Sequence, residues 1–389
     1  MKKIFTRTIL LVSFVSFFTD IASEMLYPVM PVYLKSIGFS VLLIGILEGL
    51  AESVSGLSKG YFGNLSDSIK KRVPFIRSGY SLSAISKPLL AAFNFPIWIF
   101  FARCLDRIGK GLRTSARDAM LSSEALPENK GKVFGFHRGM DTAGAAIGPF
   151  IALLFLKFHP HSYRLLFLIA FLPGVLATSL TFFLKDKTVA LNENKTNIGF
   201  FTYLKYWKRS NKPYKLLIIG LLAFAFFNST DAFLLLALKA RNYSDVELIS
   251  FYIFYNLLYA TLSYPMGLIA DKTGMKKVLI FGFVVFAIVY FGFGFALTSW
   301  QFILLFLLYA LYAASSEGIS KAWITNISEK EEIATAIGFY NSLSSVIVFL
   351  ASAVGGLIWV EFGLTTMFVF SGCGALIVAC YLFSLKNKI

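Results

Sequence analysis

The chain has 389 residues, of which 57% are hydrophobic and 17% aromatic, whereas only 15% are charged. Soluble domains carry about 45–50% apolar and about 25% charged residues, so 42 Phe residues against 21 Asp and Glu cannot be enclosed in water-soluble cores. This composition excludes a disordered chain, a disulfide-stabilised secreted scaffold and a nucleic-acid-binding globule. It predicts a helical protein embedded in a lipid bilayer, whose net charge of +16 reflects basic cytoplasmic loops rather than a nucleic-acid partner.

The cysteine content indicates neither a disulfide framework nor a metal site. All three cysteines lie in apolar stretches without the spacing of a metal site: Cys104, Cys373 and Cys380. We expect no cofactor. The N-terminal sequence resembles a signal peptide, but its apolar stretch continues past Asp20 and Glu24 without a small-residue cleavage site, so we assign it to the first membrane span.

Twelve apolar stretches are long enough to cross a bilayer, whose core of about 30 Å requires roughly 20 helical residues. In chain order they are 8–34, 40–62, 76–94, 96–119, 132–156, 163–184, 214–238, 246–269, 278–297, 300–322, 334–360 and 364–385. The long polar stretch from Lys185 to Lys215 separates six spans from the other six. We predict an all-α membrane protein with an N-terminal six-helix bundle (1–184), a cytoplasmic central loop (185–213) and a C-terminal six-helix bundle (214–389).

The two halves carry matching acidic residues at matching places. Asp20 in the first span corresponds to Asp231 in the seventh, and Asp67 after the second span corresponds to Asp271 after the eighth. Such parallel halves are typical of one large class of secondary transporters. With residues 110–132 left out of both totals, the loops on one side contain 21 Lys and Arg residues and those on the other side contain five, which predicts that both termini and the central loop are cytoplasmic.

Ionisable side chains inside the predicted spans mark candidate functional sites, because each costs at least about 2.5 kcal/mol near the bilayer centre. Asp20 and Glu24 share one face of the first span, and Glu48, Glu52 and Lys59 share a stripe of the second. Lys87 lies in the apolar third span without a partner that the sequence identifies.

The fourth span carries an unusual stripe of charge, spaced three and four residues apart on one helix face: Arg103, Asp106, Arg107, Lys110, Arg113 and Arg117. Two interpretations remain open. The span could end near Arg103 and continue as an amphipathic cytoplasmic segment. Alternatively, the helix could line a polar cavity with its guanidinium groups turned inward, which suits an anionic substrate because arginine binds carboxylate or phosphate with two parallel hydrogen bonds.

The fifth span begins with Arg138 and Asp141, whose spacing is that of a local ion pair at the cytoplasmic entrance. Gly144 and Gly148 then provide a small-residue face that lets helices approach closely, and Pro149 adds a bend.

The second half contains fewer charged residues within its spans. Glu317 and Lys321 have the spacing of a local ion pair in the tenth span. Asn228 and Asp231 lie in the seventh span, and Asp231 matches Asp20 across the repeat. Two such acids on opposite walls of a central cavity would suit transport of protons or a cation.

With these residues in place, the whole chain resembles the major facilitator superfamily, which has twelve spans in two six-helix halves. The family pattern Gly-x-x-x-Asp-x-x-Gly followed by basic residues recurs after the second and eighth spans. The first copy contains Gly63, Asp67, Lys71 and Arg72, with Lys70 in place of the second glycine; the second copy contains Gly267, Asp271, Gly274, Lys276 and Lys277. The resemblance implies that these loops gate the cytoplasmic side, with each Asp pairing with basic groups and a helix end.

Two further motifs carry the resemblance. The segment from Arg103 to Gly111 is similar to the family pattern Arg-x-x-Gln-Gly-x-Gly, in which the arginine is associated with proton coupling, although Arg107 and Lys110 replace small residues. Gly144, Gly148 and Pro149 resemble the Gly-x-x-x-Gly-Pro pattern of antiporters, without its trailing glycine pair. The resemblance therefore implies export by antiport.

Together these features predict a secondary transporter of a bacterial-type inner membrane that works as a monomer and is not an enzyme. The first hypothesis is proton-coupled export of an anionic or zwitterionic organic solute, such as a polycarboxylate or siderophore-like compound. The candidate substrate-binding residues are Arg103, Arg107, Lys110, Asp20, Glu24, Asn228 and Asp231; Asp20, Glu24, Asp231 and Arg103 are the candidates for proton coupling. Besides the two loops, Arg138, Asp141, Gly144, Gly148 and Pro149 are candidate gating residues. The alternatives are multidrug efflux of lipophilic cations, and facilitated or symport uptake of an organic anion.

Overall fold

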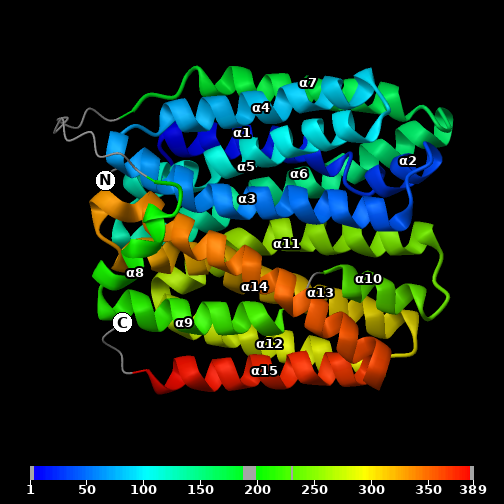
Figure 1. The fold of residues 1–389 in the computed structure, drawn as a ribbon. Helices are drawn as coiled ribbons and strands as arrows, with labels where there is room; N and C mark the ends of the chain where they lie inside the picture. The colour runs from blue at the N-terminus through cyan, green and yellow to red at the C-terminus, as the bar shows by residue number, and fades with distance from the viewer. Residues whose placement is uncertain (1–3, 187–198, 229–230, 386–389) are drawn as a thin grey trace. The chain divides into compact units, whose positions relative to one another are not determined.

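The computed structural model describes residues 4–186, 199–228 and 231–385, and within them the side chains at 41, 42, 44–46, 48, 232 and 245, including Glu48, lie outside the described set. The described residues form fifteen α-helices and three short 3-10 turns (Figure 1). In chain order the helices are α1 Arg7–Glu24, α2 Met30–Ser36, α3 Val41–Ile69, α4 Val73–Ala92, α5 Pro96–Glu124, α6 Lys130–Phe158, α7 Tyr163–Thr181, α8 Tyr206–Arg209, α9 Lys212–Phe227, α10 Ala232–Lys239, α11 Asp245–Thr273, α12 Met275–Phe295, α13 Ser299–Ile327, α14 Ile333–Phe362 and α15 Leu364–Ser384. The turns are η1 Pro127–Asn129, η2 Thr202–Lys205 and η3 Lys330–Glu332.

Ten of the twelve predicted spans correspond to one helix each, and two correspond to a pair. The first span divides into α1 and α2 around Pro28, and Pro31 lies in the first turn of α2, where its missing N–H leaves no hydrogen bond unmade. The seventh span divides into α9 and α10, with Asn228 closing α9 through its backbone N–H. The all-α prediction is confirmed, and the two divided spans occupy corresponding places in the two halves of the sequence.

Seven of the described helices are long and apolar enough to cross a membrane by length and composition alone. Helix α5 is not among them, because five charged side chains fall between Arg103 and Arg113. It nevertheless runs as one uninterrupted helix of 29 residues from Pro96 to Glu124. Both interpretations of the charged stripe stay predictions, because each of them allows the helix to continue past Arg103.

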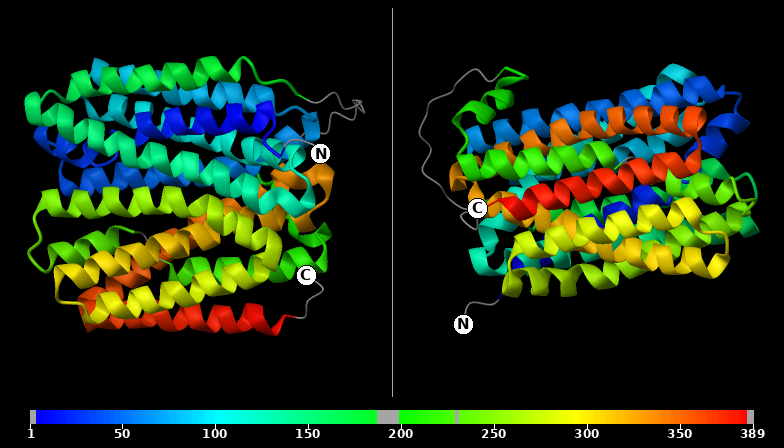
Figure 2. Two further views of the ribbon diagram at one scale, coloured as in Figure 1. Left: turned by 180° about the vertical axis from the view of Figure 1, so that it is seen from behind. Right: turned by 90° about the horizontal axis from the view of Figure 1, so that it is seen from below.

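The chain divides into two compact units. Unit 1 contains residues 1–125, 140–209 and 329–342, and unit 2 contains residues 126–139, 210–328 and 343–389. Within each unit the long helices run roughly parallel or antiparallel to one another (Figures 1 and 2). Each unit thus combines most of one half of the sequence with a short segment of the other, so the start of α6 packs in unit 2 and the start of α14 packs in unit 1. The boundaries of the two six-helix bundles remain a prediction.

Glycine and serine determine how closely α5 packs in unit 1. A Cβ atom on Gly79 of α4 would lie 2.6 Å from the Gly109 carbonyl oxygen of α5, and a Cβ atom on Gly109 would lie 2.6 Å from the Gly79 carbonyl oxygen. On its other side, a Cβ atom on Gly111 would collide with Ser58 of α3. Because these positions lack large side chains, α5 lies in backbone contact with its neighbours, and its charged face is enclosed by protein.

Candidate functional site

The charged stripe of α5 is largely buried inside unit 1. Arg103, Asp106, Arg113 and Arg117 are all less than 9% exposed, and Arg107 and Lys110 are half-buried. Charges buried to this degree require partners, because desolvation of an isolated ion is costly. Neighbouring helices supply partners for Asp106, Arg107, Arg113 and Arg117.

Lys87 of α4 has the partner that the sequence did not identify. Its Nζ atom lies 2.9 Å from Oδ1 of Asp106 and donates a longer hydrogen bond of 3.4 Å to the Ser23 hydroxyl of α1. Lys87 is 2% exposed and Asp106 is 7% exposed, so water does not replace either contact. This ion pair joins α4 to α5, and Ser23 extends the junction to α1.

Arg117 is the centre of a second network. Its guanidinium group pairs with Asp118 at 3.0 Å, lies 3.8 Å from Asp141 of α6 and donates a 2.9 Å hydrogen bond to the Ser16 hydroxyl of α1. The Ser16 hydroxyl is also 3.0 Å from the Tyr80 hydroxyl of α4. Arg117 thus holds four helices together, which indicates a structural role for this end of the stripe.

The middle of the stripe faces α3 and α4. Arg107 pairs with Glu52 of α3 at 3.3 Å. Arg113 donates a 2.5 Å hydrogen bond to the Ser83 hydroxyl and lies over the Tyr80 ring, 4.6 Å from its centroid, in a cation–π contact.

Asp20 is a half-buried carboxylate that experiences the charges of both basic and acidic neighbours. Lys110 and Arg113 act on it as cations, and Asp141 and Glu24 act on it as like charges. Helix α6 can approach this point closely because Gly144 faces Asp20: a Cβ atom there would lie 3.1 Å from the Cβ atom of Asp20.

Gly148 repeats this contact one turn further along α6. A Cβ atom on it would lie 2.7 Å from the Ile21 carbonyl oxygen. Pro149, the next residue, lies inside α6 without ending the helix. In the described residues, the predicted small-residue face of α6 is therefore the surface against which α1 packs.

Counted together, the charges of this region of unit 1 are nearly balanced. Among the described side chains of this region, seven are basic (Lys59, Lys87, Arg103, Arg107, Lys110, Arg113 and Arg117) and six are acidic (Asp20, Glu24, Glu52, Asp106, Asp118 and Asp141). An excess of positive charge is therefore not what this region offers to a solute. Lys110 and Arg113 beside Asp20 instead form a site with both signs of charge, which we call the mixed-charge site.

Unit 2 contains a carboxylate within a cluster of tyrosines. The Tyr309 hydroxyl donates a 2.6 Å hydrogen bond to Oδ1 of Asp231, and Nδ2 of Asn228 donates a 2.9 Å hydrogen bond to the Tyr312 hydroxyl. Tyr255 lies 5.1 Å from Tyr309 between ring centroids. Sequence reasoning missed these tyrosines. The available signal was the spacing of Tyr309 and Tyr312, which lie three residues apart on α13.

Arg138 also lies in unit 2, where it forms an ion pair with Glu317 of α13 and donates a 2.7 Å hydrogen bond to the Tyr259 hydroxyl of α11. Asp141 lies in unit 1 and faces Arg117. Spacing along one helix predicted pairs of Arg138 with Asp141 and of Glu317 with Lys321. The structure adds contacts between helices, which spacing within one helix cannot reveal.

The two repeated loops make equivalent contacts. In unit 1, Oδ2 of Asp67 accepts hydrogen bonds from the backbone N–H and the hydroxyl of Thr335, at 2.6 and 2.7 Å, in the first turn of α14. In unit 2, the Asp271 carboxylate accepts hydrogen bonds from the backbone N–H groups of Gly131 and Lys132, at 2.7 and 2.9 Å, in the first turn of α6. Each carboxylate therefore caps a helix N-terminus, where negative charge is stabilised by the helix dipole.

The glycines of the loops permit these contacts. A Cβ atom on Gly63 would collide with the Ala334 carbonyl group, and one on Gly267 would collide with the Gly131 carbonyl group. Lys70, which replaces a glycine of the first copy, adopts a left-handed φ of 54°, whereas Gly274 at the equivalent place has φ of 102°. The first copy therefore retains a positive-φ turn although its glycine is missing.

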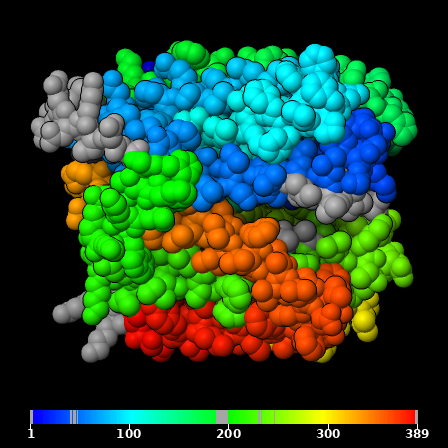
Figure 3. Space-filling model, viewed as in Figure 1, coloured from blue at the N-terminus to red at the C-terminus, as the bar shows by residue number. Residues whose placement is uncertain are grey.

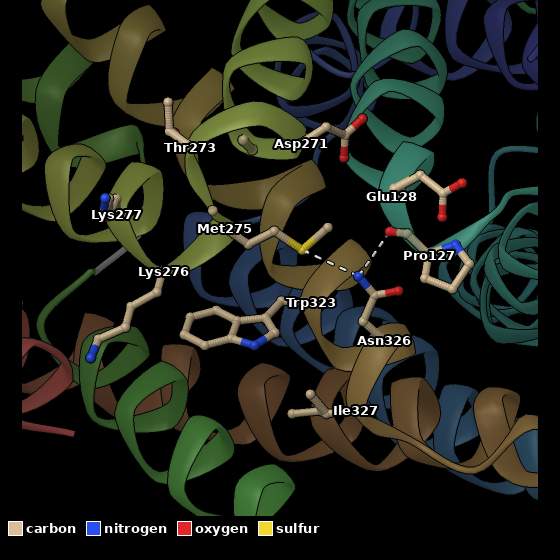
Figure 4. Close-up of a pocket in the computed structure, with 12 residues that line it drawn as sticks. Pro127, Glu128, Asp271, Thr273, Met275, Lys276, Lys277, Trp323, Asn326 and Ile327 are labelled. Carbon is tan, nitrogen blue, oxygen red and sulfur yellow. Dashed lines mark hydrogen bonds between the residues drawn. The ribbon is translucent and has the colours of Figure 1, made fainter. Parts of the chain in front are cut away.

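Basic residues hold the loops to their neighbours. Arg72 forms an ion pair with Asp67, and its backbone N–H donates a 2.6 Å hydrogen bond to Asp186 after α7. In unit 2, Lys276 donates hydrogen bonds to the carbonyl oxygens of Phe383 and Leu385 at the end of α15. A pocket of about 540 Å³ lies beside the second loop and is lined in part by Lys276, Trp323 and Asn326 (Figure 4).

Helices of membrane-spanning length, divided spans at corresponding places and two equivalent glycine–aspartate loops define an integral membrane protein of the secondary-transporter class. The sequence model of the Major Facilitator Superfamily matches residues 12–258 and 216–388. The chain belongs to this superfamily, a family of transporters, and the predicted resemblance is confirmed.

Several known proteins are similar to the chain. The MFS-type transporter MJ1317 of Methanocaldococcus jannaschii is 34% identical over 362 residues, which cover 91% of this chain and 89% of that protein. The multi-drug resistance efflux pump PmrA of Streptococcus pneumoniae is 27% identical over 282 residues, which cover 69% of this chain and 68% of that protein. The crystal structure of the human organic anion transporter MFSD10 has the same fold, with a TM-score of 0.81 at 16% identity over 97% of this chain and 99% of that one.

Proposed function

We propose that this transporter exports a zwitterionic organic solute in exchange for protons. The observation that carries the proposal is the mixed-charge site of unit 1, where Asp20 lies among the charges of Lys110 and Arg113. Lys110 and Arg113 would bind the anionic group of the solute, and Asp20 and Glu24 would bind its ammonium group. Arg103, on the same face of α5, would take part in coupling the solute to proton movement.

At such a site, the charge of the solute determines whether it moves against the proton or together with it. A solute with an ammonium group competes with the proton for Asp20, so that binding of one excludes the other, as antiport requires. A purely anionic solute binds better when Asp20 is protonated, because neutral Asp20 no longer competes for Lys110 and Arg113. It would travel together with the proton, as in symport. The near balance of charges around α5 therefore favours a zwitterion over a polyanion for export.

The experiment measures proton movement in proteoliposomes that contain a pH-sensitive dye. Glycine betaine, amino acids, dicarboxylates and tetraphenylphosphonium are added outside in turn at a fixed pH gradient. Proton flux in the direction opposite to a zwitterion, lost in the Asp20→Asn variant and kept in Lys35→Gln, supports the proposal. Proton flux in the same direction as a dicarboxylate contradicts it and supports symport of an organic anion.

A second candidate is efflux of lipophilic organic cations, which the Asp231 cluster of unit 2 favours. A carboxylate within a group of tyrosines suits an organic cation, because aromatic faces attract positive charge. The similarity to PmrA, named a multi-drug resistance efflux pump, is consistent with this reading. Transport of tetraphenylphosphonium that depends on Asp231 and Tyr309 but not on Lys110 would favour it over the first proposal.

We also propose that both repeated loops act as gates. Asp67 joins α3, from the first half of the sequence, to α14, from the second half, and Asp271 joins α11 to α6. These contacts would break and re-form during alternating access, the mechanism by which such transporters move a solute. The proposed orientation has both termini on the cytoplasmic side of the inner membrane, with the monomer as the functional form. Cysteine labelling of Lys35→Cys and Lys277→Cys from outside intact cells tests the orientation.

A further inference from the structure

The segment from Gly199 to Arg209, which we call the linker strap, lies on α3 and on the start of α14 in unit 1. It comprises η2 and α8. Tyr203 is 1% exposed, and its ring fits against Gly60 of α3, where a Cβ atom would lie 2.5 Å from the ring. Its hydroxyl lies 2.7 Å from the Ser342 hydroxyl of α14. One side chain of the strap thus contacts both helices.

The strap crosses the two helices at a place where their backbones lie close together. A Cβ atom on Gly338 of α14 would lie 2.5 Å from the Lys59 carbonyl oxygen of α3, so their backbones are in contact one residue from Gly60. Phe200 stacks on Tyr61 of α3, with ring centroids 5.2 Å apart. The strap therefore contacts the same pair of helices, α3 and α14, that the hydrogen bonds from Thr335 to Asp67 join.

The second part of the strap contacts α14 and the turn η3 before it. Trp207 stacks on Phe339 with an angle of 11° between the rings and 5.9 Å between their centroids. Arg209 forms a 2.8 Å ion pair with Glu332. The inward-facing residues of the strap therefore hold it to both sides of the α3–α14 crossing.

The outward face of the strap combines exposed aromatic and basic side chains. Phe201 is 59% exposed, Phe200 is 42% exposed and Leu204 is 40% exposed, and Lys205 and Lys208 are exposed beside them. Figure 3 shows this part of the chain, in green, at the surface beside blue α3 and the orange start of α14. Apolar side chains mixed with lysines are typical of segments that lie in a membrane interface.

Another surface of unit 1 has the same character. Phe182 and Phe183, just after α7, are 62% and 58% exposed, and the Arg77 guanidinium group lies 4.5 Å from the centroid of the Phe182 ring. Aromatic residues at the ends of spanning helices mark the boundary between the bilayer and water. Both surfaces thus combine exposed aromatic rings with basic groups.

We propose that the linker strap binds the surface of an anionic lipid leaflet and thereby stabilises the contact between α3 and α14. Phe201 and Leu204 enter the interface, and Lys205 and Lys208 bind anionic headgroups, which attract basic segments. Because Tyr203 joins the strap to both helices, lipid that holds the strap in place also holds the helices together. The lipid composition of the membrane then shifts the conformational equilibrium of the transporter, whatever its solute is.

The test measures the distance between α3 and the start of α14 by double electron–electron resonance. Spin labels are placed at Ile69→Cys and Glu331→Cys after Cys104, Cys373 and Cys380 are replaced by Ser. The full-length protein is placed in nanodiscs of phosphatidylcholine alone or of phosphatidylcholine with phosphatidylglycerol. We expect the anionic lipid to raise the ratio of short to long distances by about fivefold, the factor that one lysine near an anionic leaflet can supply.

Variants separate the lipid contact from the helix contact. Lys205→Gln with Lys208→Gln, or Phe201→Ser with Leu204→Ser, is expected to abolish the response to phosphatidylglycerol. The matched control, Lys35→Gln with Lys157→Gln, removes the same charge elsewhere and is expected to keep it. Tyr203→Ala is expected to lose the response although the basic face is intact, because the strap no longer joins the two helices.

Three results would overturn the proposal. The first is a wild-type distance distribution that is the same in both lipids. The second is a response that survives the loss of Lys205 and Lys208. The third is an equal response to soluble polyglutamate, which would assign the surface to an acidic protein rather than to lipid. None of these readouts requires transport, so failure of the proposed export leaves this test intact.

Discussion

Removal of Lys87 should destabilise the protein far more than removal of Lys87 and Asp106 together. The ions lie 2.9 Å apart and are 2% and 7% exposed. With an effective dielectric constant of about 20, their attraction amounts to about 6 kcal/mol before desolvation is subtracted. Loss of one partner leaves the other charge buried, which typically costs about 3–5 kcal/mol, whereas replacement of both by apolar residues is often neutral.

The assay is reversible unfolding in mixed dodecylmaltoside and SDS micelles, followed by tryptophan fluorescence. We expect Lys87→Met and Asp106→Leu each to lower the free energy of unfolding by about 3 kcal/mol or more, and the double variant to lie within about 2 kcal/mol of wild type. Ser23→Ala, which removes only the longer hydrogen bond, should cost at most about 1 kcal/mol. Lys35→Met on the surface is the control and should have little effect.

Additive losses in the double variant would refute this reasoning, because they would mean that the two charges do not stabilise each other. A double variant that folds as well as wild type but does not transport would show that the pair also positions the stripe of α5 for function.

The remaining predictions concern the repeated loops. Gly267→Ala should weaken the contact of α11 with the start of α6 by about 1–3 kcal/mol, because the added methyl group meets the Gly131 carbonyl. Increased thiol labelling of Lys132→Cys would show this weakening. The control variant Gly49→Ala should not increase the labelling. Asp271→Asn and Asp67→Asn should each raise labelling beside the cap that they weaken, and unchanged labelling would exclude a gating role. Lys70→Gly should raise the melting temperature, since it relieves a left-handed φ of 54° that costs about 1 kcal/mol; a lower melting temperature would show that the Lys70 side chain stabilises the loop.

The division of the spans shows how far local signals reach. Pro28 and Pro31 are visible in the sequence and explain why the first span becomes α1 and α2. The corresponding break between α9 and α10 contains no proline. Asn228 at this break donates a hydrogen bond to Tyr312, which lies 84 residues further along the chain, so its partner is a distant one. Only the first of these breaks could be predicted from the chain itself.

The candidate site shows the same limit. The sequence singles out Asp20, Arg103 and Lys110 because ionisable groups are rare and costly in a membrane span. It does not show that Asp106 pairs with Lys87 or that Arg117 faces Asp141. Their roles in solute binding and proton coupling stay predictions.

Hydropathy, charge spacing and the repeated loops depend on residues that are close in sequence, so the amino-acid sequence by itself determined the spanning helices, the duplication and the family. The partners of the buried charges, the tyrosines around Asp231 and the crossing of α3 and α14 under Tyr203 were decided by tertiary structure alone. The physical reason is that a helix sequence fixes which residues share a face, whereas the rotation and neighbours of that helix determine what the face meets.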